Sequence, residues 1–140
     1  MSIGLPCRVL EGEGEMIVGK ETAAKILACL ADPEVRSILQ AVEGGPKTIA
    51  NIRDLVDYPQ STLYRKMSVL RECGLLMVDR FVMRPDGKRD AVFACTFDEI
   101  RLESELDGIR VDLVESKRSI ERRWLEAFYS KNSTSQAVPR

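Results

Sequence analysis

The stretch PQSTLYRKMSVLRECG, residues 59–74, predicts a single helix with a defined start, end and two distinct faces. Pro59 suits the first turn, where a missing N–H costs nothing, and Gly74 suits the left-handed residue after the last turn. An apolar stripe follows the i, i+4, i+7 spacing of a helix and consists of Leu63, Met67, Leu70 and, at its edge, Val69. The opposite face is polar and consists of Gln60, Ser61, Thr62, Tyr64, Arg65, Lys66 and Ser68.

The polar face of this helix has the chemistry of a DNA-reading surface. Hydroxyl, amide and guanidinium groups read base edges and bind phosphates in the major groove. For an isolated helix, a solvated amphipathic surface is the simpler interpretation. The elements predicted on both sides of this helix favour the DNA-reading interpretation.

The segment before residue 59 predicts three shorter helices. Thr22 is a candidate N-cap for a helix to about Leu30, and Asp32-Pro33 begins a second helix to about Val42. Gly44-Gly45-Pro46 ends that helix. Thr48 then caps a short helix to about Leu55, and Asp57-Tyr58 connects it closely to the helix of residues 59–73. Two helices joined by such a turn are typical of a helix-turn-helix.

The segment after Gly74 predicts a β-hairpin. Residues 75–83 are rich in β-favouring side chains, and residues 84–88 contain an Asp-Gly turn. Residues 90–97 alternate between two faces, with Ala91, Phe93, Cys95 and Phe97 on one face and Val92, Ala94 and Thr96 on the other. A hairpin directly after a helix-turn-helix is a wing. Its tip carries Arg84, Lys88 and Arg89, which would contact phosphates or the minor groove. A solvated charged turn explains the tip equally well when the tip is considered alone.

The charge of the chain is unevenly distributed. The 140 residues have a net charge of −1, but residues 58–89 hold seven Lys or Arg against three Asp or Glu, a net of +4. Residues 1–57 carry a net of −3 and residues 90–140 a net of −2. A local basic segment is what a confined polyanion contact requires, although an excess of this size also arises by chance.

Residues 32–97 resemble the winged helix-turn-helix of ArsR- and MarR-type transcription regulators. The resemblance is carried by DPEVRSILQAV, GGPKTIANI, YPQSTLYRKMSVLRECGLL and the wing MRPDGKRD, which follow one another in this order. It implies that residues 59–73 form the recognition helix, with Lys66 and the wing cations on the DNA backbone. The Cys-x-Cys pair of the metal-responsive members is missing. The DNA-binding residues predicted in this way are Thr48, Gln60, Ser61, Thr62, Tyr64, Arg65, Lys66, Arg84, Lys88 and Arg89.

The segment that follows the wing predicts a second hairpin and a last helix. Residues 100–114 alternate with period two around Asp107-Gly108, which favours a hairpin over the helix that their Glu, Leu and Arg content also allows. Ser116 caps a helix from Lys117 to about Tyr129. We expect its apolar face to pair with a second copy, although packing on its own domain is the simpler alternative. The predicted dimerisation residues are Ile120, Trp124, Ala127 and Phe128.

The predicted fold class is α+β, a winged helix-turn-helix domain with an added C-terminal β-hairpin and a C-terminal dimerisation helix. Residues 1–19 are an N-terminal lead-in or a short ribbon, and residues 20–97 the winged-helix domain. Residues 98–129 hold the second hairpin and the last helix, and residues 130–140 a disordered tail.

Several classes of function find no support in the sequence. The chain has four cysteines without a C-x-x-C pair and no histidine, so we expect no zinc site and no His-dependent catalysis. We favour buried structural thiols over a redox or metal sensor. There is no phosphate-binding Gly-rich loop, no signal peptide and no apolar run long enough to span a bilayer. We therefore expect no enzyme, no cofactor and a cytoplasmic protein.

The leading prediction is a sequence-specific regulator that binds double-stranded DNA as a homodimer. The alternative is a winged-helix module that binds a protein through the helix of residues 59–73 and lacks specific DNA binding. For a regulator, the second hairpin and the last helix are compatible with a small-molecule effector pocket against the dimer interface or with a simple extension of that interface, and no residue selects between the two.

Overall fold

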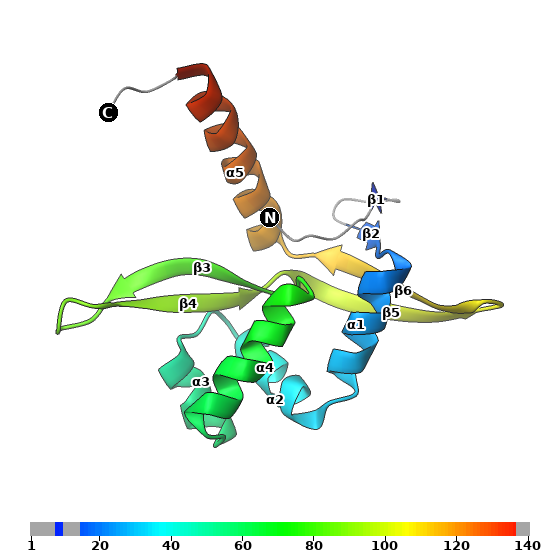
Figure 1. Ribbon diagram of the computed structural model, residues 1–140, viewed down its shortest axis with the longest axis horizontal. Coiled ribbons are helices and arrows are strands. Elements are labelled where there is room, and N and C mark those ends of the chain that lie inside the picture. Colours follow the sequence, from blue (N-terminus) through cyan, green and yellow to red (C-terminus); the bar gives the residue numbers. More distant parts are fainter. Residues whose placement is uncertain (1–7, 10–14, 137–140) are drawn as a thin grey trace.

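The computed structural model describes residues 8–9 and 15–136. Four helices follow two short N-terminal strands and gather on one side of the molecule (Figure 1). They are α1 (Lys20–Leu30), α2 (Pro33–Glu43), α3 (Ile49–Val56) and α4 (Gln60–Glu72). The strands are β1 (Arg8–Val9), β2 (Glu15–Ile17), β3 (Leu76–Met83), β4 (Arg89–Cys95), β5 (Phe97–Glu105) and β6 (Gly108–Glu115), and the last helix is α5 (Lys117–Gln136).

The helix starts follow the expected capping chemistry in two cases and differ in two. Asp32 caps α2 by accepting a hydrogen bond from the N–H of Glu34, and Thr48 forms a reciprocal capping box with Asn51 at α3. The prediction that Thr22 caps α1 is wrong, because α1 begins at Lys20 with Gly19 as its N-cap. Pro59 is the N-cap of α4 instead of lying in its first turn, and its extended backbone directs the chain into the helix.

The turn between α3 and α4 is tight. Asp57 adopts the left-handed conformation, with φ 57°, and its N–H closes the end of α3 on the carbonyl of Arg53. It is the only non-glycine residue with positive φ among residues 8–9 and 15–136. At the other end of α4, Gly74 has φ 83°, as the sequence predicts. The left-handed residues Asp57 and Gly74, one before and one after α4, set the direction of this helix.

The core lies where α1, α2 and α4 meet the strands. The predicted stripe of α4 is buried at Leu63, Met67 and Leu70, whereas Val69 is 40% exposed and does not belong to it. The other fully buried side chains of the centre are Ile26, Ile38, Ile52, Leu75, Val111 and Leu113. Burying an aliphatic side chain of this kind stabilises a fold by roughly 1.5–3 kcal/mol.

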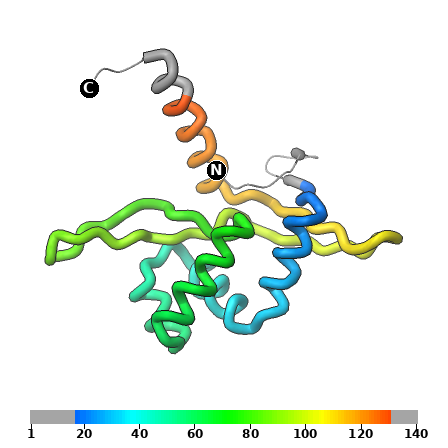
Figure 2. Tube along the Cα trace, in the orientation of Figure 1, coloured from blue at the N-terminus to red at the C-terminus, as the bar shows by residue number. Residues whose placement is uncertain are grey.

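Two antiparallel hairpins follow the helices and point in opposite directions (Figure 2). The first pairs β3 with β4, with a bulge between Val78 and Arg80, and is the predicted wing. The second pairs β5 with β6, which confirms the hairpin interpretation of residues 100–114. The structure is therefore a winged helix-turn-helix with an added hairpin, as predicted.

The junction between the two hairpins is a single residue, Thr96. The prediction of one alternating strand over residues 90–97 is wrong at its end, because β4 stops at Cys95 and Phe97 opens β5. Thr96 is buried, and its hydroxyl donates to the Gly74 carbonyl at 2.5 Å. Its N–H donates to the Leu75 carbonyl, and its own carbonyl accepts from the N–H of Ser116. The two hairpins, the end of α4 and the start of α5 are thus connected at one point.

The N-terminal segment joins the second hairpin. Strands β1 and β2 pair with each other, and β2 pairs with β6, giving a sheet of order β1-β2-β6-β5. The ribbon alternative for residues 1–19 therefore holds for residues 8–9 and 15–17. Residues 1–7 and 10–14 of that predicted lead-in lie outside the described residues.

The last helix, α5, projects away from the rest of the molecule (Figure 1). It continues to Gln136 instead of ending near Tyr129. The prediction of a disordered tail over residues 130–140 is therefore wrong for residues 130–136, and residues 137–140 lie outside the described residues. Within the described part of the chain, no helix has the length and apolar character needed to cross a membrane.

Candidate nucleic-acid interface

The exposed side of α4 presents most of the residues predicted to contact DNA. Gln60, Ser61, Tyr64 and Arg65 are exposed, and Thr62 is half-buried. The Gln60 amide donates to the Tyr64 hydroxyl at 3.4 Å, so the first turn of α4 holds a linked pair of polar groups at its surface. The buried stripe on the other side fixes the rotation of α4 and therefore the direction of this polar face.

A hollow of about 270 Å³ lies where α3, α4 and the wing meet. Gln60 and Tyr64 of α4 line one side of it, and Arg84 and Arg89 of the wing line the other. The structure thus brings together two segments that are separated by some twenty residues in the sequence. Ser61, Thr62, Arg65 and Lys88 lie outside this hollow, as does Thr48, whose hydroxyl accepts the N–H of Asn51.

Arg53 is a residue of this surface that sequence reasoning missed. It lies on α3, lines the same hollow and donates to the Gln60 side-chain carbonyl at 3.3 Å. The sequence signal that points to Arg53 is a cation on the outer face of the helix that precedes the turn.

Lys66 is engaged within the protein, in contrast to the predicted phosphate contact. Its ammonium lies 2.5 Å from Asp32 and 3.5 Å from Glu34, both at the start of α2. The hydrogen bond from Lys66 lowers the pKa of Asp32, and the same bond raises the pKa of Lys66. This ion pair joins α4 to the N-terminus of α2 and so helps to orient α4.

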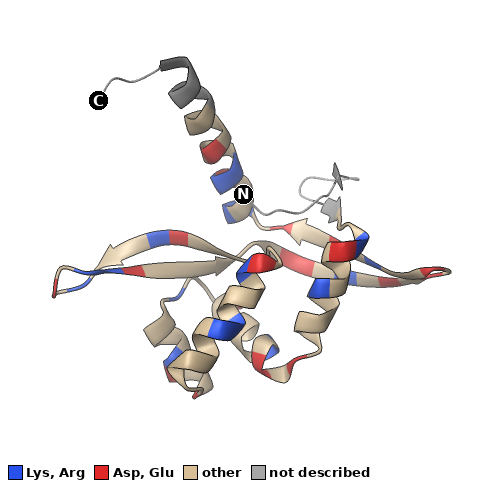
Figure 3. Ribbon diagram, viewed as in Figure 1, with Lys and Arg blue, Asp and Glu red and all other residues tan. Residues whose placement is uncertain are grey.

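The three cations of the wing tip differ in their surroundings. Arg84 is paired within the turn, at 2.6 Å from Asp86 and 3.4 Å from Asp90, and these hydrogen bonds raise its pKa. The Arg89 guanidinium lies over the Phe81 ring at 4.5 Å. Lys88 is exposed, and its ammonium has no ion-pair partner in the described part of the chain. The cations of the wing and α4 lie on one side of the molecule in Figure 3.

The predicted dimerisation residues lie on a surface that the protein itself does not cover. Trp124 is 72% exposed, Phe128 and Ala127 are also exposed, and Ile120 is half-buried. The alternative in which this face packs on its own domain is therefore wrong for Trp124 and Phe128. The same helix also exposes Leu125 and Tyr129, which the sequence interpretation omitted.

The root of α5 is held by charged groups of both hairpins. Arg123 donates to both oxygens of Glu115 at the end of β6, at 2.5 and 3.0 Å, and the Ser119 hydroxyl adds a third hydrogen bond at 2.7 Å. The Glu115 side chain is only 1% exposed. On the wing side, Arg122 donates to the main-chain carbonyl of Asp79.

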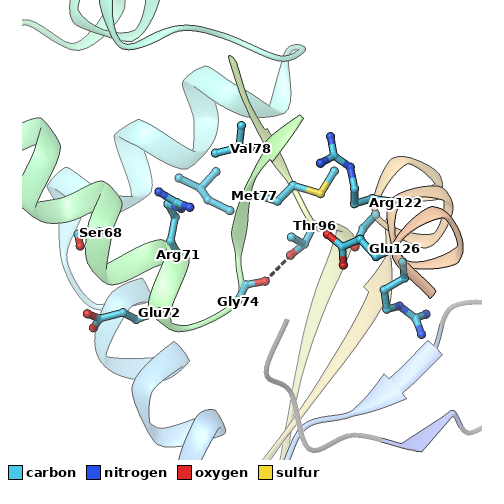
Figure 4. A pocket seen from close by; sticks show the side chains of 12 residues that line it. Ser68, Arg71, Glu72, Gly74, Met77, Val78, Thr96, Arg122 and Glu126 are labelled. Atoms are coloured by element: carbon cyan, nitrogen blue, oxygen red, sulfur yellow. Dashed lines mark hydrogen bonds between the residues drawn. The ribbon is translucent and has the colours of Figure 1, made fainter. Parts of the chain in front are cut away.

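A second hollow, of about 470 Å³, lies between the end of α4, the start of β3 and the root of α5 (Figure 4). Its polar lining is largely engaged within the protein. Thr96 donates to Gly74, and Arg122 donates to Asp79. Among the described residues, no group of three or more Cys, Asp or Glu side chains is placed to hold a metal ion.

The helical part of this interface matches a known family. Residues 30–79 match the family described as a helix-turn-helix domain. This segment is therefore similar to a helix-turn-helix domain. It contains α2, α3 and α4 and the start of β3, so the polar face of α4 lies on the second helix of the motif.

The chain is also similar, at low sequence identity, to several solved structures. The chain is 16% identical to an ArsR family transcriptional regulator, with 84% of this chain and 99% of that one covered and a TM-score of 0.37. It is 17% identical to the transcriptional repressor BigR from Xylella fastidiosa and to NolR from Sinorhizobium fredii, both with a TM-score of 0.38. Those matches cover 79% of this chain and 85% and 83% of BigR and NolR. No curated protein matches this chain.

Proposed function

We propose that this protein is a sequence-specific regulator of transcription that binds double-stranded DNA as a homodimer. The observation that carries the proposal is the surface shared by the polar face of α4, Arg53 of α3 and the wing cations. A helix-turn-helix binds DNA by inserting its second helix into the major groove while the neighbouring elements contact the backbone. The hollow between α4 and the wing has the concave form that such a contact needs.

In the proposed complex, α4 lies in the major groove. Gln60 is suited to a bidentate contact with adenine and Arg65 to one with guanine, because their donors and acceptors match those base edges. Ser61, Thr62 and Tyr64 supply hydroxyls beside them. Arg65 is exposed, and its guanidinium has no hydrogen-bond or ion-pair partner in the described part of the chain.

The wing contacts the backbone or the minor groove in this proposal. Lys88 is the strongest candidate because its ammonium is exposed and unpaired within the described residues. Arg89 can swing from the Phe81 ring to a phosphate. Arg84 contributes less, because its charge is already balanced by Asp86 and Asp90. Lys66 acts indirectly by fixing α4 against α2.

The proposed dimer forms through the exposed apolar face of α5. Trp124 and Phe128 are the large side chains of that face, Ala127 lies between them, and Ile120 continues the face towards the start of α5. A two-fold pair would place two copies of α4 about one helical turn of DNA apart. Aromatic side chains of this kind carry most of the binding energy in protein interfaces.

The test is a titration of binding to duplexes selected from genomic fragments and to random duplexes, at several salt concentrations. We expect a specificity ratio of about 10³ or more, together with a steep salt dependence for both kinds of duplex. Arg65→Ala should lower the ratio, because a bidentate base contact contributes about 1–3 kcal/mol of discrimination. Lys117→Ala removes an equally exposed cation from α5, away from α4, and should change nothing. A ratio near one for the unmodified protein would favour the protein-binding alternative.

A further inference from the structure

Two cysteines that are distant in the sequence meet in the core. Cys29 lies near the end of α1 and Cys73 is the C-cap residue of α4. Their sulfur atoms are 3.2 Å apart, and the residues are 4% and 3% exposed. Neither is part of a sequence motif, so only the fold brings them together.

We propose that Cys29 and Cys73 are a modification site that a hydroperoxide converts into a reversible intramolecular disulfide. This inference goes beyond DNA binding and does not rest on it. It concerns the reactivity of the pair itself, which can be measured on the free protein.

The distance between the two sulfur atoms suits bond formation. A disulfide has a sulfur–sulfur bond of about 2.05 Å, so the pair must close by only about 1.2 Å. The two residues are on separate helices, and Cys73 lies at the very end of its helix, before the left-handed Gly74. Small rotations of the two side chains at a helix end can supply the movement.

A hollow gives a small oxidant access to both thiols. It has a volume of about 420 Å³ and lies between α1, α2 and α4, with both cysteines in its wall. Ala28, Val35 and Val69 provide an apolar lining. Hydrogen peroxide is far smaller than this space, so burial of the sulfurs within the wall does not prevent the reaction.

The neighbouring groups assign different roles to the two sulfurs. The hydrogen bond from the Cys29 thiol lowers the pKa of Cys73, and the nearby positive charge of Lys25 acts in the same direction. The pKa of Cys29 is raised by its hydrogen bond with Cys73 and by desolvation. A thiolate is the reactive form of cysteine, so Cys73 is the nucleophile of the pair.

The chemistry then takes two balanced steps. The Cys73 thiolate attacks one oxygen of the hydroperoxide, the O–O bond breaks, and Cys73 becomes a sulfenic acid while the other oxygen leaves as hydroxide, or as alkoxide from an organic hydroperoxide. The Cys29 sulfur then attacks the sulfenic sulfur, its proton and the hydroxyl group leave as water, and the disulfide forms. The hydroperoxide is reduced by two electrons, and the two cysteines are oxidised by the same number.

Cys95 provides an internal comparison. It is half-buried in β4, and burial raises its pKa to about 12, with Glu43 and Asp98 acting in the same direction. No other cysteine sulfur of the described residues is a hydrogen-bond partner of Cys95. We therefore expect Cys95 to remain a thiol under conditions that oxidise the pair. Cys7 lies outside the described residues and is replaced in the test.

The experiment treats the full-length Cys7→Ser variant with a small excess of hydrogen peroxide and follows it by intact-mass and non-reducing peptide mass spectrometry. We expect the loss of two hydrogen atoms per chain, a cross-linked peptide pair joining residues 29 and 73, and complete reversal by dithiothreitol. A disulfide through Cys95, a cross-link between two chains, a higher oxide of Cys73 or two unchanged thiols would each overturn the proposal.

Two further variants separate reactivity from folding. Cys29→Ser, shown to be folded by circular dichroism, removes the resolving thiol but keeps a hydroxyl that can donate to Cys73. Peroxide should then give a sulfenic acid at residue 73 that dimedone traps, without a cross-link. Cys95→Ser should behave as the parent protein does. Absence of dimedone labelling in folded Cys29→Ser would contradict the assignment of Cys73 as the nucleophile.

Discussion

The two hairpins have similar backbones and opposite net charges. The wing, β3 to β4, carries four Lys or Arg against three Asp or Glu over residues 76–95, whereas residues 97–115 of the second hairpin carry two against seven. Both hairpins also expose apolar side chains, which are Phe81 and Met83 on the wing and Leu102, Leu106 and Ile109 on the second hairpin. The two hairpins point in opposite directions (Figure 3).

This difference indicates that the two ends of the molecule suit different partners. A cationic ribbon beside α4 is suited to phosphate, whereas an acidic ribbon would be repelled by it. In the proposed function, the wing and α4 form the nucleic-acid side of the molecule, and the exposed apolar face of α5 forms the protein side.

The largest effect is expected at the protein side. Trp124→Ala should weaken self-association about a hundredfold, because a central aromatic side chain in an interface typically contributes 2 kcal/mol or more. Analytical ultracentrifugation over a range of protein concentrations measures it. Met83→Ala removes an equally exposed apolar side chain from the wing and should leave the association unchanged. Equal effects of the two variants would contradict the division into two sides.

The next largest effect is a loss in the free energy of unfolding when the contacts between α5 and the two hairpins are removed one at a time. Arg123→Ala leaves the buried Glu115 carboxylate with only one of the three hydrogen bonds described above, and we expect a loss of about 2 kcal/mol in the free energy of unfolding. Arg118→Ala breaks a longer, more exposed contact to Asp79 of the wing, at 3.4 Å, and should cost less than about 0.5 kcal/mol. Urea denaturation measures both. A larger loss in Arg118→Ala would mean that the wing, not the second hairpin, anchors α5.

A smaller effect is expected for single charge reversals at the two hairpins. Lys88→Glu should lower DNA affinity about tenfold at low salt and reduce the salt dependence, because it removes one phosphate contact and adds a repulsion. Arg101→Glu makes the same change of charge on the second hairpin and should alter affinity less than about twofold. Fluorescence anisotropy with a labelled duplex distinguishes them. Similar losses in both variants would point to long-range charge and not to a wing contact.

The smallest effect concerns the turn of the wing. The N–H of Lys88 and the guanidinium of Arg84 hold the pKa of Asp86 below its ordinary value, so ionised Asp86 stabilises the turn. This contribution is fully present above about pH 4 and is lost as the pH falls through the lowered pKa of the folded state. Amide hydrogen exchange at Gly87 and Lys88 should therefore show reduced protection in acid. In Asp86→Asn the same amides should lack this pH dependence, and a persistent dependence would exclude Asp86 as its source.

Much of the fold was predictable because local signals were strong. Asp32-Pro33, Thr48 and Gly74 each use backbone chemistry that admits few alternatives, and the period-two pattern around Gly108 separated a hairpin from a helix. The errors lie where local signals are weak. Gly19 has no side chain that could identify it as an N-cap in the sequence. Residues 130–136 are polar and show no apolar stripe, although α5 continues through them.

The candidate site was less predictable than the fold, because it depends on contacts between distant segments. Nothing near Lys66 in the sequence shows that Asp32 holds it, since the two residues meet only after α2 and α4 pack. The same is true of Cys29 and Cys73. Arg53 joins the surface through the geometry of the turn at Asp57, which places α3 beside the first turn of α4.

The single-residue junction at Thr96 constrains how this chain can vary in length. Side chains of a strand alternate between faces, so one residue inserted between β4 and β5 would exchange the inward and outward faces of the second hairpin relative to the wing. It would also displace the hydroxyl that binds Gly74 at the end of α4. Both hairpin tips, by contrast, are open to longer loops. Relatives of this protein should therefore differ in length at residues 84–88 and 106–107 and keep the spacing of residues 95–97 unchanged.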